Sequence, residues 1–171
     1  MKSLFLIRHG HAHPAAPGLP DHARTLDERG RSEGLEMGRR LGQRGVTPDR
    51  VITSSAARAR MTAELLACGM DVPAERLVQD RRIYASSVMN LLYLVRSLDD
   101  SLACVMLVGH NPEMTGLAQL LSEAMPDLPT CAVVAFDFGD AAWSEVGSVA
   151  PAASHFDSPA SGPGRHLPGS A

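Results

Sequence analysis

Two arginines and two histidines of this sequence have the chemistry needed to bind and transfer a phosphoryl group. Arg8 and His9 come directly after the apolar run of residues 4–7, and Gly10 follows them. Arginine grips phosphoryl oxygens through its planar fork of N–H donors. A neutral histidine can attack phosphorus, and neighbouring arginines should lower its pKa and keep it neutral. The segment predicts an anion site, with phosphate as the expected ligand and His9 as its chemical centre.

Arg58 is the second arginine of this set. It lies in the first turn of a helix predicted over residues 56–68, after a strand predicted over residues 49–53. A cation is unfavourable at a helix N-terminus, which already carries partial positive charge. An anion bound at that terminus would make the arginine favourable. Arg60, two residues on, is expected to be solvated.

His110 stands at a third junction of the same kind. The most apolar run of the chain, residues 102–108, ends in Gly109 and His110, and Asn111 and Pro112 follow. Asn111 suits an N-cap and Pro112 the first position of a helix. If the sheet is mainly parallel, the three junctions open at one edge, where ligands of such sheets bind. His110 could then donate to an equatorial phosphoryl oxygen.

The remaining elements follow from the apolar pattern. A capping box at Thr25 and Glu28 predicts a helix that runs to about Arg44. Glycines recur every four residues along it, which predicts that another backbone packs close to that side. We also expect an edge strand at residues 77–78, a helix over residues 87–98 and a closing antiparallel hairpin of residues 132–138 and 142–149.

Composition limits the kinds of protein this chain can be. Its 171 residues suit one domain, which we place at 1–149, with a flexible Pro/Gly/Ser/Ala-rich tail at 150–171. A net charge of −3 without a long basic run argues against nucleic acid as a partner. Three scattered cysteines suggest neither a disulfide framework nor a zinc site. No signal peptide or membrane span is expected, so we predict a cytoplasmic monomer.

At these residues the chain resembles the histidine phosphatase superfamily, which includes phosphoglycerate mutases. The matching pieces are Leu6-Ile7-Arg8-His9-Gly10, Ser54-Ser55-Ala56-Ala57-Arg58-Ala59 with Thr62, and Gly109-His110-Asn111-Pro112, within residues 1–138. The resemblance implies a three-layer α/β/α fold with a mainly parallel sheet. It also implies a transient phosphohistidine on His9, a phosphate pocket of Arg8, Arg58 and His110, and no metal or other cofactor. The short chain and residues 25–30 look most like the SixA-type phosphohistidine phosphatases, which lack a large cap insertion.

Two departures from the family pattern bear on the substrate. His11, two positions after the expected nucleophile, stands where this branch often has an acidic or basic residue, so we count it and Gly10 as candidate substrate contacts. Residues 82–87, where larger members carry an acidic proton donor, contain no carboxylate. Esters with poor leaving groups need that donor. A phosphoramidate needs it less, because its nitrogen is readily protonated, which favours protein phosphohistidine as the substrate.

Three alternatives remain open from the sequence. His9, His11 and His13 alternate and Asp21-His22 follows, which superficially matches the ligands of a metal-dependent hydrolase. The scaffold could serve as a non-catalytic phosphate-binding module. The enzyme could also be a phosphatase or mutase for a small-molecule ester such as a sugar or nucleotide phosphate.

Overall fold

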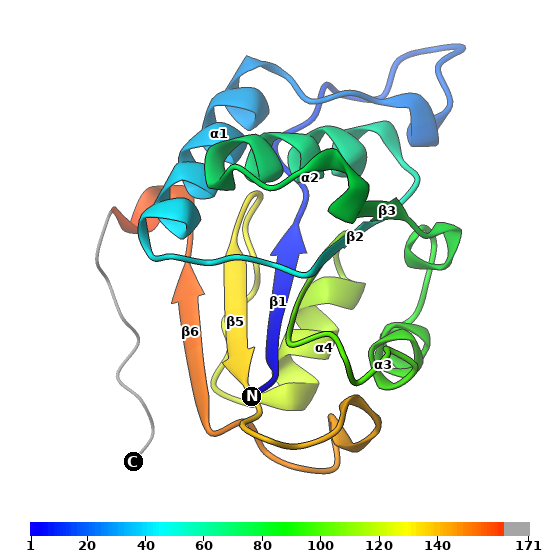
Figure 1. Ribbon diagram of the computed structural model, residues 1–171. Helices are drawn as coiled ribbons and strands as arrows, with labels where there is room; N and C mark the ends of the chain where they lie inside the picture. Colours follow the sequence, from blue (N-terminus) through cyan, green and yellow to red (C-terminus); the bar gives the residue numbers. More distant parts are fainter. Residues whose placement is uncertain (163–171) are drawn as a thin grey trace.

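A six-stranded sheet between two layers of helices makes up the fold (Figure 1). The computed structural model describes residues 1–162. The strands lie in the order β3-β2-β4-β1-β5-β6. Four neighbours, β3, β2, β4 and β1, are parallel, whereas β5 runs antiparallel to β1 and β6 antiparallel to β5. The bounds are β1 Ser3–Arg8, β2 Arg50–Thr53, β3 Leu77–Gln79, β4 Cys104–Gly109, β5 Val133–Asp137 and β6 Ala153–Asp157.

Helices cover both faces of the sheet, which confirms the predicted three-layer α/β/α fold. The helices are α1 Glu28–Gln43, α2 Ala57–Met70, α3 Val88–Arg96 and α4 Glu113–Leu121. Strand β1 shows the two-sided burial that its sequence predicts. Leu4 and Leu6 pack into the core beneath α3 and α4, whereas Phe5 and Ile7 pack beneath α1 and α2. Successive side chains of a strand point to opposite faces, so one apolar run contributes to both cores.

The glycine side of α1 packs directly on its surroundings, as the spacing predicts. A Cβ at Gly38 would lie 2.8 Å from the Leu66 carbonyl oxygen of α2, and one at Gly42 2.8 Å from the Gly69 carbonyl oxygen. At the start of the helix, a Cβ at Gly30 would lie 2.1 Å from the carbonyl oxygen of His11. The glycines therefore let α1 rest on α2 and on the loop after β1.

The start of α1 differs from the prediction of a Thr25 capping box. The N-cap is Asp27, whose carboxylate accepts the backbone N–H of Gly30 at 2.9 Å. Thr25 lies in extended chain before the helix, where its carbonyl accepts the N–H of His13 at 3.0 Å. The prediction for α4 is also shifted: the helix begins at Glu113, and Pro112 occupies the N-cap position.

The C-terminal part of the fold requires a larger correction. The predicted strand at 142–149 is wrong, because Trp143–Glu145 forms a turn of 3-10 helix, and β6 is the strand that pairs with β5. The predicted flexible tail is therefore wrong for β6, while residues 163–171 of that tail lie outside the described residues. Asp157, at the end of β6, is buried and bonded to Arg40 of α1 at 3.3 Å and to Arg44, the C-cap residue of that helix, at 2.8 Å. Backbone pairing and these ion pairs hold a segment with few apolar side chains.

The parallel register places the predicted junctions at one edge of the sheet. Arg8 of β1 is opposite Gly109 of β4, and Thr53 of β2 is opposite Val108. The segments after these three strands therefore leave the sheet side by side. Among the described residues, no helix is both long enough and apolar enough to cross a membrane.

Candidate active site

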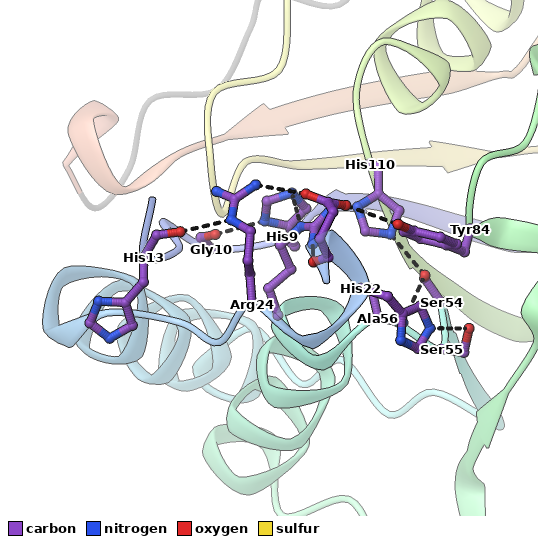
Figure 2. Close-up of polar contacts among 12 residues, drawn as sticks. His9, Gly10, His13, His22, Arg24, Ser54, Ser55, Ala56, Tyr84 and His110 are labelled. Atoms are coloured by element: carbon purple, nitrogen blue, oxygen red, sulfur yellow. Dashed lines mark hydrogen bonds and ion pairs between the residues drawn. The ribbon is translucent and has the colours of Figure 1, made fainter. Parts of the chain in front are cut away.

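His9 and His110 lie side by side where β1 and β4 end (Figure 2), and Arg58, at the start of α2 after β2, reaches His9. The Nε of Arg58 donates to Nε2 of His9 at 3.2 Å. The ring centroids of His9 and His110 are 5.1 Å apart. Arg58 and His110 are buried, and His9 is partly buried. Three of the four side chains predicted to form the pocket therefore lie together.

The backbone fixes which nitrogen of His9 is available for chemistry. Nδ1 lies 2.7 Å from the carbonyl oxygen of Gly10, and a carbonyl oxygen can only accept a hydrogen bond. Nδ1 therefore carries the proton of the neutral ring. The lone pair is then on Nε2, the atom to which Arg58 donates.

Both histidines are neutral near pH 7. Burial, followed by the charges of Arg58, Arg8 and Arg24, lowers the pKa of His9 to about 4, although the hydrogen bond that His9 donates to the Gly10 carbonyl acts to raise it. The predicted direction is correct, but desolvation is a larger cause than the arginine charges. Burial also lowers the pKa of His110 to about 3. A neutral imidazole with a free lone pair is a competent nucleophile.

His110 is held by Ser54, a residue of the β2–α2 junction. The Ser54 hydroxyl accepts the backbone N–H of Ala56 at 3.2 Å and lies 2.8 Å from Nε2 of His110. Nδ1 of His110 is buried and has no hydrogen-bond partner among residues 1–162. The ring thus has one nitrogen anchored to the scaffold and the other unpaired.

Asp21 lies in the segment between β1 and α1 and binds Arg58. From the sequence, Asp21 was only a possible metal ligand. Arg58 Nη2 donates to Oδ2 of Asp21 at 3.0 Å, and Arg58 Nη1 donates to its backbone oxygen at 2.7 Å. Arg24 and Tyr84 also donate to this carboxylate, each at 2.9 Å. The hydrogen bond from Arg24, followed by those from Arg58 and Tyr84, holds the pKa of Asp21 well below its usual range.

These contacts add Asp21, Arg24 and Tyr84 to the site. Sequence reasoning missed the roles of all three because they come from loops, and a loop's path cannot be read from periodicity. The sequence feature that could have indicated them is the pair Asp21 and Arg24, an acid and an arginine three positions apart before α1. A carboxylate here holds the guanidinium donors that an anionic ligand would otherwise use.

Arg8 precedes His9 in the chain, but its side chain forms no hydrogen bond or ion pair with His9, Arg58 or His110. Its side chain follows the alternation of β1 to the sheet face covered by α4, and Nη1 donates to the carbonyl oxygen of Leu128, in the segment between α4 and β5, at 2.9 Å. Its Nε is buried without a hydrogen-bond partner among the described residues. Its charge nevertheless lowers the pKa of His9, so Arg8 is close enough to act electrostatically.

Gly10 and His11 have structural contacts rather than places in the cluster. The N–H of Gly10 donates to the Thr62 hydroxyl at 2.9 Å, and that hydroxyl donates to the carbonyl oxygen of Arg58 at 2.7 Å. Thr62 thereby links the loop after β1 to α2. His11 is bonded through Nδ1 to Asp27, the N-cap residue of α1, and half of its side chain is exposed. The structure does not bring His11 to His9, Arg58 or His110.

The alternating histidines do not form a metal-binding set in this fold. His9 faces Arg58, His11 binds Asp27, and the ring of His13 points away from the cluster (Figure 2). His22 bonds to Ser55 at 2.9 Å. Within the described part of the chain, no three histidine, cysteine, aspartate or glutamate side chains are grouped so that they could hold a metal ion.

Comparison with known proteins identifies a family with these features. The family model of the histidine phosphatase superfamily, branch 1, matches residues 4–81, which include His9 and Arg58. An uncharacterised protein of Mycobacterium tuberculosis is 33% identical over 113 residues, covering 66% of this chain and 68% of that protein.

Solved structures share the fold. The SixA protein of Agrobacterium tumefaciens, provisionally assigned as a phosphohistidine phosphatase, has a TM-score of 0.73 and 29% identity over 80% of this chain and 90% of its own. The protein histidine phosphatase SixA in complex with tungstate has a TM-score of 0.76 and 23% identity, over 93% of this chain and 98% of its own. A more distant neighbour is a mycobacterial glucosyl-3-phosphoglycerate phosphatase, with a TM-score of 0.59 and 14% identity over 85% of this chain and 94% of its own.

The sequence match and the fold agree with the convergence of a neutral histidine, an arginine and a second histidine at one sheet edge. This chain belongs to the histidine phosphatase superfamily, branch 1.

Proposed function

We propose that this protein is a metal-independent phosphatase that forms a transient phosphohistidine on His9 and acts on protein phosphohistidine. Nε2 of His9 attacks phosphorus and forms a P–N bond, while the bond to the leaving group breaks and its electron pair leaves with that group. A water molecule then attacks the phosphoryl group on His9. This releases inorganic phosphate and restores the neutral ring.

The observation that carries this proposal is the state of His9. Gly10 holds the proton on Nδ1, so the lone pair lies on Nε2, and the low pKa leaves it unprotonated at neutral pH. Arg58 donates to that same nitrogen in the free protein. As substrate binds, we expect this N–H to shift to a phosphoryl oxygen and release the lone pair for attack.

The other predicted residues act on the charge of the transferring group. Arg58 binds phosphoryl oxygens, and Arg8 contributes its positive charge and its unpaired Nε. With the proton of His110 on Nδ1, the Ser54 hydroxyl donates to Nε2, and Nδ1–H is free to donate to an oxygen where negative charge develops. Gly10 acts by fixing the tautomer of His9, and His11 keeps its predicted substrate contact only if it leaves Asp27.

The choice of phosphohistidine rests on the supply of protons to the leaving group. Asp21 is the carboxylate bonded into the site, and three donors keep it ionised, so it cannot serve as an acid at neutral pH. Without such an acid, the leaving group of an alkyl phosphate ester would depart as a poorly stabilised alkoxide. The imidazole nitrogen of phosphohistidine takes its proton readily, and the similarity to SixA proteins points the same way.

A small-molecule phosphate ester is the second candidate. The fold is shared with the phosphatase of glucosyl-3-phosphoglycerate, whose substrate is a small molecule. A mutase reaction on such esters would use the same phosphohistidine and return the phosphoryl group to a second hydroxyl.

Phosphate release in excess chelator separates these possibilities. Wild type, His9→Ala and His13→Ala would be assayed with a phosphohistidine peptide and an aryl phosphate. His13, whose ring points away from the cluster, is the matched control (Figure 2). We expect wild type and His13→Ala to release phosphate, faster from the peptide, and His9→Ala to release none. Activity of His9→Ala would refute the nucleophile, and a preference for the ester would move the small-molecule function ahead.

A further inference from the structure

A hollow of about 470 Å³ lies beside the histidine and arginine cluster and has no role in the mechanism above. Its lining comes from the η1 turn Asp21–Ala23, the start of α2 and the segment after β3. The lining residues are His22, Ser55, Arg60, Gln79, Arg81 and Tyr84. The lining contains two arginines and no acidic side chain.

Neither arginine has an internal partner. Among residues 1–162, the side chains of Arg60 and Arg81 form no ion pair or hydrogen bond, and Nε of Arg60 is buried. Asp80, next to Arg81 in sequence, binds the guanidinium of Arg82 at 2.6 Å, and Asp21 binds Arg24 and Arg58. Glu64, one turn after Arg60 in α2, is exposed and forms no ion pair with it. Arg60, expected to be solvated, instead lines the hollow with an unsatisfied donor. A buried donor without a partner is costly unless a ligand supplies the acceptor.

Two aromatic rings of the hollow lie between it and the catalytic cluster. The Tyr84 ring lies 5.6 Å from that of His110, and its hydroxyl donates to Asp21. The His22 ring packs edge-on to Tyr84 at 4.8 Å, and its Nε2 bonds to the Ser55 hydroxyl. A molecule with its phosphoryl group at His9 would reach Arg60 and Arg81 by passing Tyr84.

We propose that this hollow binds a second anionic group of the substrate, a carboxylate separate from the phosphoryl group that is transferred. The inference rests on the proposed phosphatase function and narrows its substrate class to molecules with two anionic groups. Two unpaired guanidinium groups suit such an anion because each offers several N–H donors in one plane. The anion is either an acidic side chain near the phosphohistidine of a protein or a carboxylate of a small phosphate ester.

Two pairs of probes test this preference and distinguish the sources. The first pair is a phosphohistidine peptide with glutamate beside the phosphohistidine and the same peptide with glutamine. The second pair is 4-carboxyphenyl phosphate and phenyl phosphate. kcat/KM is measured for each probe with wild type, with the double variant Arg60→Gln/Arg81→Gln and with Arg39→Gln. Arg39 is an exposed residue of α1 and controls for loss of positive charge.

We expect the double variant to lower kcat/KM for the anionic member of a pair about 3- to 10-fold more than for its neutral partner, as partly exposed charge pairs allow. This difference should shrink as salt is added. Arg39→Gln should leave both members unchanged. An effect confined to the peptides identifies an acidic protein side chain, and an effect on the aryl phosphates identifies a small-molecule carboxylate.

Equal effects of the double variant on both members of each pair would overturn this inference while leaving the phosphatase function intact. Absence of phosphate release from all four probes by wild type would refute the phosphatase function itself, and the inference with it. Each failure is therefore recognised by a different result.

Discussion

His9 and His110 should make the protein lose stability at a pH well above that at which its carboxylates titrate. In the folded protein the pKa values are about 4 for His9 and about 3 for His110, whereas an unperturbed histidine has a pKa of about 6.5. The unfolded chain therefore binds protons more readily than the fold. Stability is full above pH 6.5 and is lost as the pH falls toward the folded values.

The size of the loss follows from these pKa values. Each histidine destabilises the fold by about 1.4 kcal/mol per pH unit between its unfolded and folded pKa. From pH 7 to pH 5 this amounts to about 2 kcal/mol for each histidine and about 4 kcal/mol for both. The paired carboxylates have lowered pKa values and contribute only below about pH 4, so this interval isolates the histidines.

Urea unfolding followed by fluorescence of Trp143, the single and buried tryptophan, measures the effect. The free energy of unfolding would be determined at pH 7, 6 and 5 for wild type and for His110→Gln. Glutamine can keep a hydrogen bond to Ser54 but does not titrate. We expect the variant to show about half of the wild-type pH dependence. A flat wild-type profile would refute the lowered pKa values of both histidines. An unchanged slope in the variant would refute the lowered pKa of His110.

Two further predictions concern the framework of the site. Gly30→Ala should destabilise the fold by about 3 kcal/mol and lower activity, because the new Cβ would lie 2.1 Å from the carbonyl oxygen of His11. Gly34→Ala meets only side-chain atoms of Leu65, at 3.2 and 3.3 Å, and should change stability by less than about 1 kcal/mol. Urea unfolding and phosphate release check both, and equal effects would contradict the close approach. Asp21→Asn should strengthen inhibition by inorganic phosphate about 3- to 10-fold, because a carboxylate no longer competes for the site arginine. Weaker inhibition would show that Asp21 orients that arginine instead.

The sequence allowed prediction of the parts of the fold that depend on local pattern. A run without alternation indicated a strand buried on both faces, and β1 is such a strand. Glycines at helical spacing indicated close backbone packing, which α1 shows against α2. His9, Arg58 and His110 were predicted together because each follows a strand, and parallel strands end at one edge.

The parts that could not be predicted depend on long-range pairing. Strand β6 is stabilised by backbone pairing with β5 and by ion pairs of Asp157. Neither interaction can be predicted from the amino-acid composition of the segment. Asp21 reaches Arg58 only through the path of a loop. The position of the Arg8 side chain could have been predicted, because alternation along β1 places it on the sheet face opposite to Ile7, the face covered by α4.

Trapping the phosphoenzyme tests the central claim most directly. The protein would be mixed with a ³²P-labelled phosphohistidine peptide in excess chelator, quenched in alkali within the first turnover, and digested for mass spectrometry. Alkali preserves P–N bonds, so the label should appear on the peptide that contains His9 and should be absent from His9→Ala. Turnover without a labelled peptide, or label on another residue, would contradict the assignment of His9 as the nucleophile.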